Sequence, residues 1–245
     1  LGYCSEQFQQ PEFCYPHDRV IHFWTELERF TGDPDIGLTV GRHLPSSRGS
    51  IQSCLFLGAP RFGDALKTSF KYMRLLSDAI SVDLHNLGDI SYLHLKSHRS
   101  DVNAFRHYTE CLLLGFIAFY RDVTDHQFKP TRIDFACEAP IGMGDRAAIY
   151  GCPLHFGCSE NRIYFETSVL ACSCGYAEPE LLRLHENYAR TALRRLEEQD
   201  FLVRVHVVIS ALLEKGEVTL EVASRALGLN TTELKYRLST LGTHF

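Results

Sequence analysis

One segment of the sequence gathers cysteine and histidine, the residue types that bind zinc or react with oxidants. The candidate ligands are Cys152, His155, Cys158, Cys172 and Cys174. A zinc site needs thiolates that tight turns bring together. Leu154 and Phe156 stand between the candidates, a pattern equally typical of a packed strand with core cysteines. We predict no metal site, and keep as an alternative a metal- or thiol-redox sensor that uses the four cysteines.

Nine cysteines in a chain without a secretion signal indicate a reducing compartment. We therefore expect a cytoplasmic protein rather than a disulfide scaffold. A cysteine-dependent enzyme would need one thiol held against a base, and no local signature marks such a pair. We predict that the protein is not an enzyme, and we assign no catalytic residue and no cofactor.

A second group of polar side chains suggests a binding site for a small molecule. Ile90, Tyr92 and His94 alternate with Leu93 and Leu95, as on a half-buried strand. Tyr92 and His94 therefore share one face, which lines a cavity or faces solvent. Together with Tyr72 on the preceding helix, they are the predicted ligand-binding residues. Ligand pockets are mostly apolar with a few convergent polar groups, so we expect an apolar, fatty-acid-like effector.

The elements that carry these residues alternate between helical and strand patterns. Apolar spacing predicts helices at about 20–30, 36–44, 62–76, 100–119, 144–150 and 179–199, and strands at 50–57, 80–84, 90–95, 131–137 and 162–166. Asn86 to Asp89 form a plausible hairpin turn. Residues 1–200 thus form one mixed α/β domain, the fold class being α+β.

The last 45 residues, 201–245, have the pattern of a small all-α subdomain. A supporting helix carries Val205 to Leu212. Thr219 can cap a second helix, Gly228 supplies the positive φ of a tight turn, and Thr231 or Thr232 begins a third helix that ends at Gly242. Three such helices form a helix-turn-helix, whose last helix lies in the major groove of DNA.

Bulk composition neither supports nor excludes DNA binding. The net charge of −5 excludes a protein that coats DNA through a uniformly basic surface. No apolar run is long enough to span a bilayer, so no membrane partner is expected. Because the chain begins at Leu1 rather than at Met, we expect its N-terminus to be trimmed or to lie upstream.

The C-terminal pattern closely resembles the first helix-turn-helix of the AraC family of transcription regulators. The matching residues are Thr219-Leu-Glu-Val-Ala-Ser-Arg, Leu227-Gly-Leu, Leu234 to Leu238 and Gly242-Thr-His-Phe245. Earlier segments resemble the helix-rich effector domain of one branch of that family: Gly37-Leu38 with Gly41, Ala59-Pro60 with Ala65-Leu66, Tyr72, and Tyr150 to Phe156.

The resemblance implies an effector-binding and dimerisation domain at 1–200 and a truncated DNA-binding region at 201–245. It implies operator DNA, a small-molecule effector and a second copy of the chain as partners of the full-length protein, and it allows contact with RNA polymerase. The predicted DNA-binding residues are Thr232, Lys235, Tyr236 and Arg237. Tyr236 stands where the family often has Arg, so the family's base preference does not carry over. The chain stops before a second helix-turn-helix, and we expect this fragment to bind its operator poorly.

The helix at 179–199 is the predicted dimer contact. One apolar stripe contains Leu181, Leu184, Tyr188, Ala192 and Leu196, and a second contains Leu182, Ala189 and Leu193. A helix that is apolar on two sides must be covered on two sides. Either its own domain and a partner share these sides, or a single protomer buries both.

Overall fold

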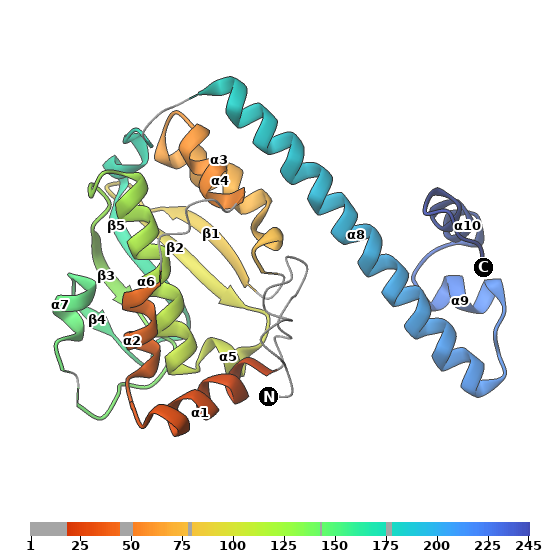
Figure 1. Cartoon of the computed structure of the whole chain (residues 1–245), viewed down its shortest axis with the longest axis horizontal. Coiled ribbons are helices and arrows are strands. Elements are labelled where there is room, and N and C mark those ends of the chain that lie inside the picture. The colour runs from red at the N-terminus through yellow and green to blue at the C-terminus, as the bar shows by residue number, and fades with distance from the viewer. Residues whose placement is uncertain (1–18, 45–50, 78–79, 143, 175–177) are drawn as a thin grey trace. The chain divides into compact units, whose positions relative to one another are not determined.

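The structure is a computed structural model that describes residues 19–44, 51–77, 80–142, 144–174 and 178–245. It divides into two compact units, Leu1–Asn187 and Tyr188–Phe245. The first unit mixes helices with a five-stranded sheet and the second is all-helical, which confirms the predicted α+β class (Figure 1). No described helix is both long and apolar enough to cross a membrane.

The sheet has the strand order β1-β2-β5-β3-β4. The strands are β1 (Ile80–Asn86), β2 (Ile90–Ser97), β3 (Pro130–Asp134), β4 (Leu154–His155) and β5 (Asn161–Glu166). The β1–β2 hairpin turns where predicted, with Gly88 at φ 94°. All pairs are antiparallel except β3 with β4.

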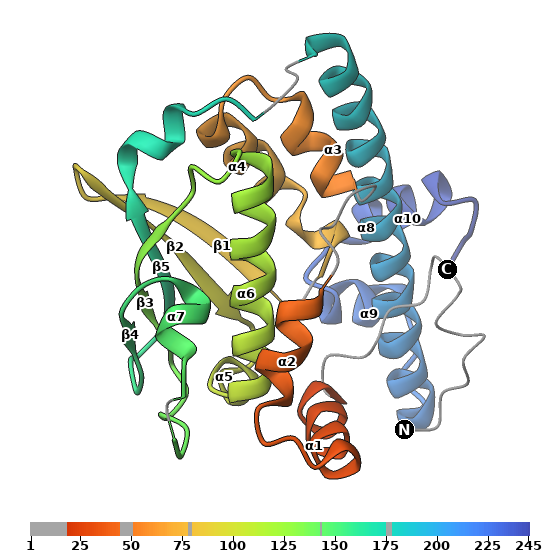
Figure 2. The ribbon, with the colours of Figure 1, turned by 60° about the vertical axis from the view of Figure 1, so that its left-hand side comes forward.

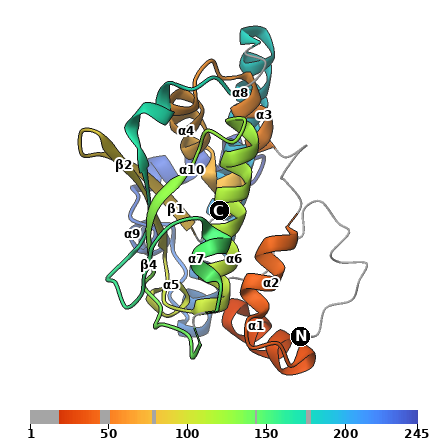
Figure 3. The same cartoon turned by 90° about the vertical axis from the view of Figure 1, so that its left-hand side faces the viewer.

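Alternation along the strands gives this sheet one apolar face and one polar face. On β2, the apolar Leu93 and Leu95 are buried in the core. Tyr92 and His94 alternate with them along the strand and therefore point to the opposite face. The helices α6 (Arg106–Val123) and α2 (Ile36–His43) lie on the apolar side, with α6 between the sheet and α2 (Figures 2 and 3).

The remaining helices of the first unit surround α6 and the edges of the sheet. They are α1 (Val20–Thr31), α3 (Ile51–Gly58), α4 (Phe62–Lys71), the 3₁₀ turn η3 (Met73–Leu75), α5 (Ser100–Asn103), α7 (Arg146–Tyr150) and the 3₁₀ turn η4 (Thr167–Ala171). Gly37 allows the close packing of α2 on α6, because an added Cβ would lie only 2.3 Å from the backbone oxygen of His107.

The predicted strand at 50–57 is wrong, since Ile51–Gly58 is the helix α3; Ser50 lies outside the described residues. The buried positions Gln52, Leu55, Phe56 and Ala59 follow the helical spacing i, i+3, i+4, i+7. The helical period was hard to recognise in the sequence, because Gln52 is polar although its position is buried. Its amide is buried because tertiary partners satisfy it, donating from Nε2 to the Tyr72 carbonyl oxygen at 2.8 Å and accepting from the Ser69 hydroxyl.

The two helices predicted on either side of residue 200 are one helix, α8 (Pro179–Lys215). The second unit contains its C-terminal part with α9 (Leu220–Ala226) and α10 (Thr231–Thr240). The buried core of this unit consists of Phe201, Val205, Ala223, Leu227, Leu234 and Leu238.

The predicted caps and turns of the second unit are confirmed. The Thr219 hydroxyl accepts a hydrogen bond from the Val222 amide, and Gly228 and Gly242 both have a φ of 71°. The helix α10 begins at Thr231, one residue after its cap Asn230. These features match the predicted helix-turn-helix pattern.

Candidate functional site

An apolar pocket of about 350 Å³ lies in the first unit, between α6 and the helices around it. Its walls come from α1, α3, α4, η3 and α6, together with Leu44 and Leu76. They comprise Val20, Phe23, Trp24, Leu44, Gln52, Phe56, Ser69, Met73, Leu76, Tyr108, Cys111, Leu112, Gly115, Phe116, Phe119 and Tyr120. This volume falls within the range of small-molecule sites, roughly 300–1,000 Å³.

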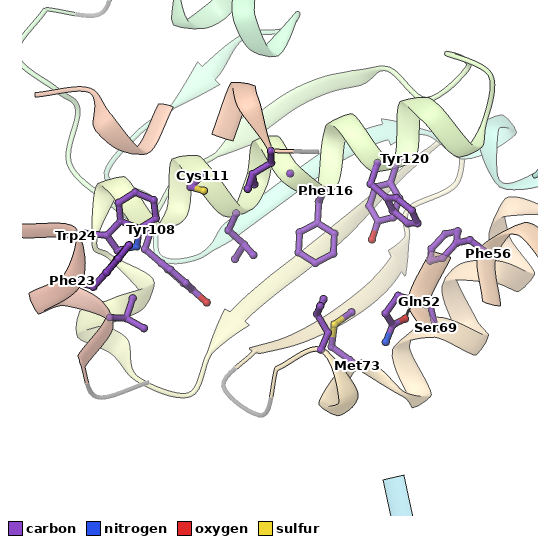
Figure 4. A pocket seen from close by; sticks show the side chains of 16 residues that line it. Phe23, Trp24, Gln52, Phe56, Ser69, Met73, Tyr108, Cys111, Phe116 and Tyr120 are labelled. Carbon is purple, nitrogen blue, oxygen red and sulfur yellow. Dashed lines mark hydrogen bonds between the residues drawn. The ribbon is translucent and has the colours of Figure 1, made fainter. Parts of the chain in front are cut away.

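Helical periodicity explains why α6 contributes so much of the wall. Tyr108, Leu112 and Phe116 recur every four residues and therefore share one side of the helix. Figure 4 shows Tyr108 and Phe116 projecting from α6 toward the region of Met73. Gly115 leaves room between them and Leu44, whose Cδ1 would lie 3.2 Å from an added Cβ.

The two ends of the pocket differ in chemistry. Phe23 and Trp24 lie at one end, and Gln52 and Ser69 lie together near the other (Figure 4). Gln52 and Ser69 are both buried and hydrogen-bonded to each other. Because an amide oxygen and a hydroxyl oxygen can each accept a second hydrogen bond, this end can recognise a polar group of a ligand.

The described walls of the pocket carry no charge at neutral pH. No Asp, Glu, Lys, Arg or His is among the lining residues. Burial raises the pKa of the Tyr108 and Tyr120 hydroxyls and raises the pKa of the Cys111 thiol to about 11. An apolar, uncharged cavity of this kind favours ligands that are themselves largely apolar.

A different polar cluster lies on the opposite side of α6 and is saturated by ion pairs. Arg146 Nε donates to Glu110 Oε1 at 2.8 Å, and the Arg146 guanidinium also pairs with Asp35. Arg106 lies 3.0 Å from Asp35 and 3.3 Å from Glu110. Glu110 and Arg146 are almost completely buried. This network links Asp35, at the N-terminal end of α2, with α6 and α7, and its charges are matched within the network.

The helix-turn-helix presents a polar surface on α10. Thr232, Lys235 and Tyr236 are exposed and lie at helical spacing on one side, while Leu234 and Leu238 are buried on the other. Arg237 pairs with Glu233 at 2.9 Å and covers the Phe201 ring, with its Cζ 5.5 Å from the ring centroid.

Comparison with known proteins identifies the family. The model of the arabinose-binding N-terminal domain of the AraC transcription regulator matches residues 2–174. The chain belongs to the AraC family of transcription regulators. The region that holds the pocket is thus an AraC-type effector-binding domain, as the sequence resemblance implied.

Two Pseudomonas aeruginosa proteins are similar to this chain. The chain is 24% identical over 220 residues to an ornithine utilization regulator, a match that covers 87% of this chain and 63% of that protein. The chain thus spans less than two thirds of the regulator's length. The crystal structure of the transcriptional regulator CdpR has the same fold, with a TM-score of 0.57 and 16% identity, over 100% of this chain and 82% of CdpR.

The predicted ligand-binding residues of this AraC-type domain do not line the pocket. Tyr72 is not a lining residue, and its carbonyl oxygen accepts a hydrogen bond from the lining residue Gln52. Tyr92 and His94 lie on the polar face of the sheet, where the Tyr92 ring stacks on His85 at a centroid distance of 4.7 Å. The wall residue Gln52 was missed at the sequence level. Its signal was the helical spacing with Leu55, Phe56 and Ala59.

The structure does not bring the candidate thiols together into a metal site. Within the described residues, Cys152, Cys158, Cys172 and Cys174 are free and belong to no group of three close metal-ligand side chains. Cys174 is completely buried, and burial raises its pKa to about 12. The thiol-sensing alternative is not favoured for this AraC-family member.

Proposed function

We propose that the protein is a ligand-responsive, DNA-binding regulator whose effector is a largely apolar small molecule that binds in the α6 pocket. The uncharged pocket of about 350 Å³ beside Gln52 and Ser69 carries this proposal. A molecule with an alkyl or aromatic body and one hydrogen-bonding end matches the two ends of the cavity. Its apolar body gains free energy at about 25 cal/mol per Å² of buried apolar surface.

The same lining argues against the compounds named by the relatives. Ornithine carries two ammonium groups and a carboxylate, and burying such charges without partners is strongly unfavourable. Arabinose needs many hydrogen bonds, whereas Gln52 and Ser69 already bond to each other. We therefore expect the effector of this chain to differ from both.

Trp24 provides a direct readout, because it is the single tryptophan of the chain and lines the pocket. Tryptophan fluorescence and thermal unfolding are measured against a long-chain alcohol, a fatty acid, an aromatic acid, L-ornithine and L-arabinose. A ligand at 100 times its dissociation constant stabilises the protein by about 2.7 kcal/mol. We expect an apolar compound to shift both signals. A response to ornithine or arabinose alone would refute the proposal.

Matched variants locate the binding site. Met73→Trp fills part of the pocket, and Gln52→Leu removes its polar end; both should weaken effector binding while His94→Gln should not. If binding were lost only in His94→Gln, the effector site would lie instead on the polar face of the sheet, which holds Tyr92 and His94. Tyr72→Phe tests the remaining predicted residue and should bind as wild type.

We further propose that α10 is the recognition helix and contacts bases through Thr232, Lys235 and Tyr236. Their exposure on one side of the helix, opposite the buried Leu234 and Leu238, supports this role. Arg237 is oriented by Glu233 and Phe201 within the subdomain. It is therefore better placed to approach a phosphate than to read a base.

Selection of duplexes from a random-sequence pool, followed by mobility shift with the protein, tests this interface. Tyr236→Ala should relax the selected sequence at one position, at a cost of about 1–3 kcal/mol. Lys235→Ala should weaken binding to all sequences if it contacts phosphate, and at one position if it reads a base. Glu221→Gln on α9 serves as the control. Unchanged affinity and preference in both α10 variants would remove α10 from the interface.

Finally, we propose that the protein forms a homodimer through the exposed stripe of α8. Leu181, Leu184 and Tyr188 have exposed fractions of 46%, 61% and 65%, whereas Leu182 packs against the core of its own unit. Sedimentation equilibrium should show a dimer that Leu184→Glu dissociates and Arg190→Glu, on the other side of the helix, does not. A Leu184→Glu variant that stays folded and dimeric would exclude this surface.

A further inference from the structure

The polar face of the sheet brings three metal-binding side chains together. Asp83 and His85 lie two residues apart on β1 and therefore project from the same face. His94 on β2 is the direct cross-strand partner of Asp83 in the antiparallel register. Each of the three residues offers one ligand atom, and these atoms all lie within 4.8 Å of one another.

His94 shows the clearest sign that this cluster is incomplete. Its side chain is only 6% exposed, and its Nε2 atom is buried without a hydrogen bond of good geometry. Glu160 Oε2 lies 3.1 Å from that nitrogen. A buried imidazole nitrogen with a poorly aligned partner is unfavourable, so a metal ion that fixes the His94 ring would stabilise the native state.

We propose that Asp83, His85 and His94 form a binding site for a divalent transition-metal ion, with Zn²⁺ as the best match, and that Glu160 supports His94. Two imidazoles and one carboxylate are a ligand set typical of zinc sites that leave a position open. The Glu160 carboxylate can hold the His94 ring through Nε2, which leaves the other ring nitrogen, Nδ1, to bind the ion. The site lies on the opposite face of the sheet from the core and does not depend on the proposed effector pocket.

The neighbouring side chains already hold the cluster in place. The His85 ring stacks on Tyr92 at an interplanar angle of 13°, and the His85 and His94 ring centroids are 6.1 Å apart.

Two cations lie close to the site and must be displaced or tolerated. Lys96 Nζ is 3.5 Å from Asp83 Oδ2, and Arg162 Nη2 is 2.5 Å from Glu160 Oε2. The side chains of both Lys96 and Asp83 are exposed, and exposed ion pairs contribute little to stability. Lys96 can therefore swing into solvent when a metal ion neutralises Asp83, and Arg162 can keep Glu160 oriented toward His94.

Cobalt titration of the reduced chain in chelator-free buffer tests the site and separates it from the cysteines. Co²⁺ in a nitrogen and oxygen site gives visible d–d absorption without the near-ultraviolet charge-transfer band of a thiolate ligand. We expect d–d absorption that saturates at one ion per chain, that Zn²⁺ displaces and that lacks the thiolate band. Asp83→Asn and His85→Gln should each weaken binding by about tenfold or more.

Controls keep this test independent of folding. Asp83 and His85 are not buried, so their variants should retain the wild-type circular dichroism. His206→Gln removes an exposed histidine from α8 and should bind as wild type. A dominant thiolate band, or equal affinity in wild type, Asp83→Asn and His85→Gln, would overturn the proposal.

Discussion

Two polar clusters lie beside α6, and they differ in how their buried polar groups are satisfied. On one side of the helix, Glu110 is buried with its charge matched by Arg146 and Arg106. On the other side, Gln52 and Ser69 are buried but uncharged and border an open cavity. The first cluster has its strong acceptors filled by arginine, so it leaves no place for a ligand. In the second cluster, the oxygens of Gln52 and Ser69 can accept further hydrogen bonds, and a cavity lies next to them. This combination is typical of a binding site.

The largest expected effect comes from breaking the charged cluster. Arg146→Met leaves Glu110 buried without its main partner, which should lower the free energy of unfolding by about 3–5 kcal/mol. Urea unfolding followed by Trp24 fluorescence measures this loss. The double variant Arg146→Met/Glu110→Leu should recover much of the stability, because it removes the uncompensated charge. A double variant no more stable than Arg146→Met would show that the pair itself stabilises the fold.

Phe62 and Phe116 allow a comparison between a side chain in the packed core and one that borders the pocket. Phe62 is fully buried in the core, and Phe62→Ala should cost about 3–5 kcal/mol. Phe116 borders the pocket, so Phe116→Ala only enlarges an existing cavity and should cost clearly less. The measurement is again the free energy of unfolding. Equal losses would mean that the pocket wall is as tightly packed as the core.

The uncharged cluster should be less sensitive than the charged one. Gln52→Leu removes the acceptor of the Ser69 hydroxyl, and a buried hydroxyl without a partner costs about 1–3 kcal/mol. Gln52→Leu/Ser69→Ala removes both polar groups and should regain part of that loss. If Gln52→Leu destabilised the chain as much as Arg146→Met, the contrast between the two clusters would fail.

The smallest effect is a pH dependence from the opposite face of the sheet. Burial lowers the pKa of His94, with Lys96 and Arg162 acting in the same direction and Glu160 and Asp83 against it. His94 therefore binds fewer protons in the folded than in the unfolded state. Its contribution to stability falls as the pH drops below the unfolded pKa of about 6.5. In the presence of a chelator, His94→Gln should flatten the loss of stability between about pH 7 and pH 5, as thermal unfolding would show. If the substitution left the dependence of stability on pH unchanged, other titratable groups would be its cause.

The sequence alone determined the elements whose stability comes from neighbours in the chain. The cap at Thr219, the left-handed turn at Gly228 and the left-handed Gly242 just after α10 each depend on a few adjacent residues, and the sequence predicted all three. The hairpin between β1 and β2 was predicted from alternation and turn residues for the same reason.

Only the tertiary structure decided where the sites lie. Gln52 is helical and buried because its partners Ser69 and Tyr72 lie 17 and 20 residues away. Glu110 meets Arg146 across 36 residues, and the pocket combines walls from separate helices. The short run between Gly49 and Gly58 that predicted a strand at 50–57, and the alternation that predicted ligand contacts at Tyr92 and His94, are local patterns. Burial and partnership are properties of the packed chain, because side chains distant in sequence supply the hydrogen bonds and charges that make a buried polar group stable.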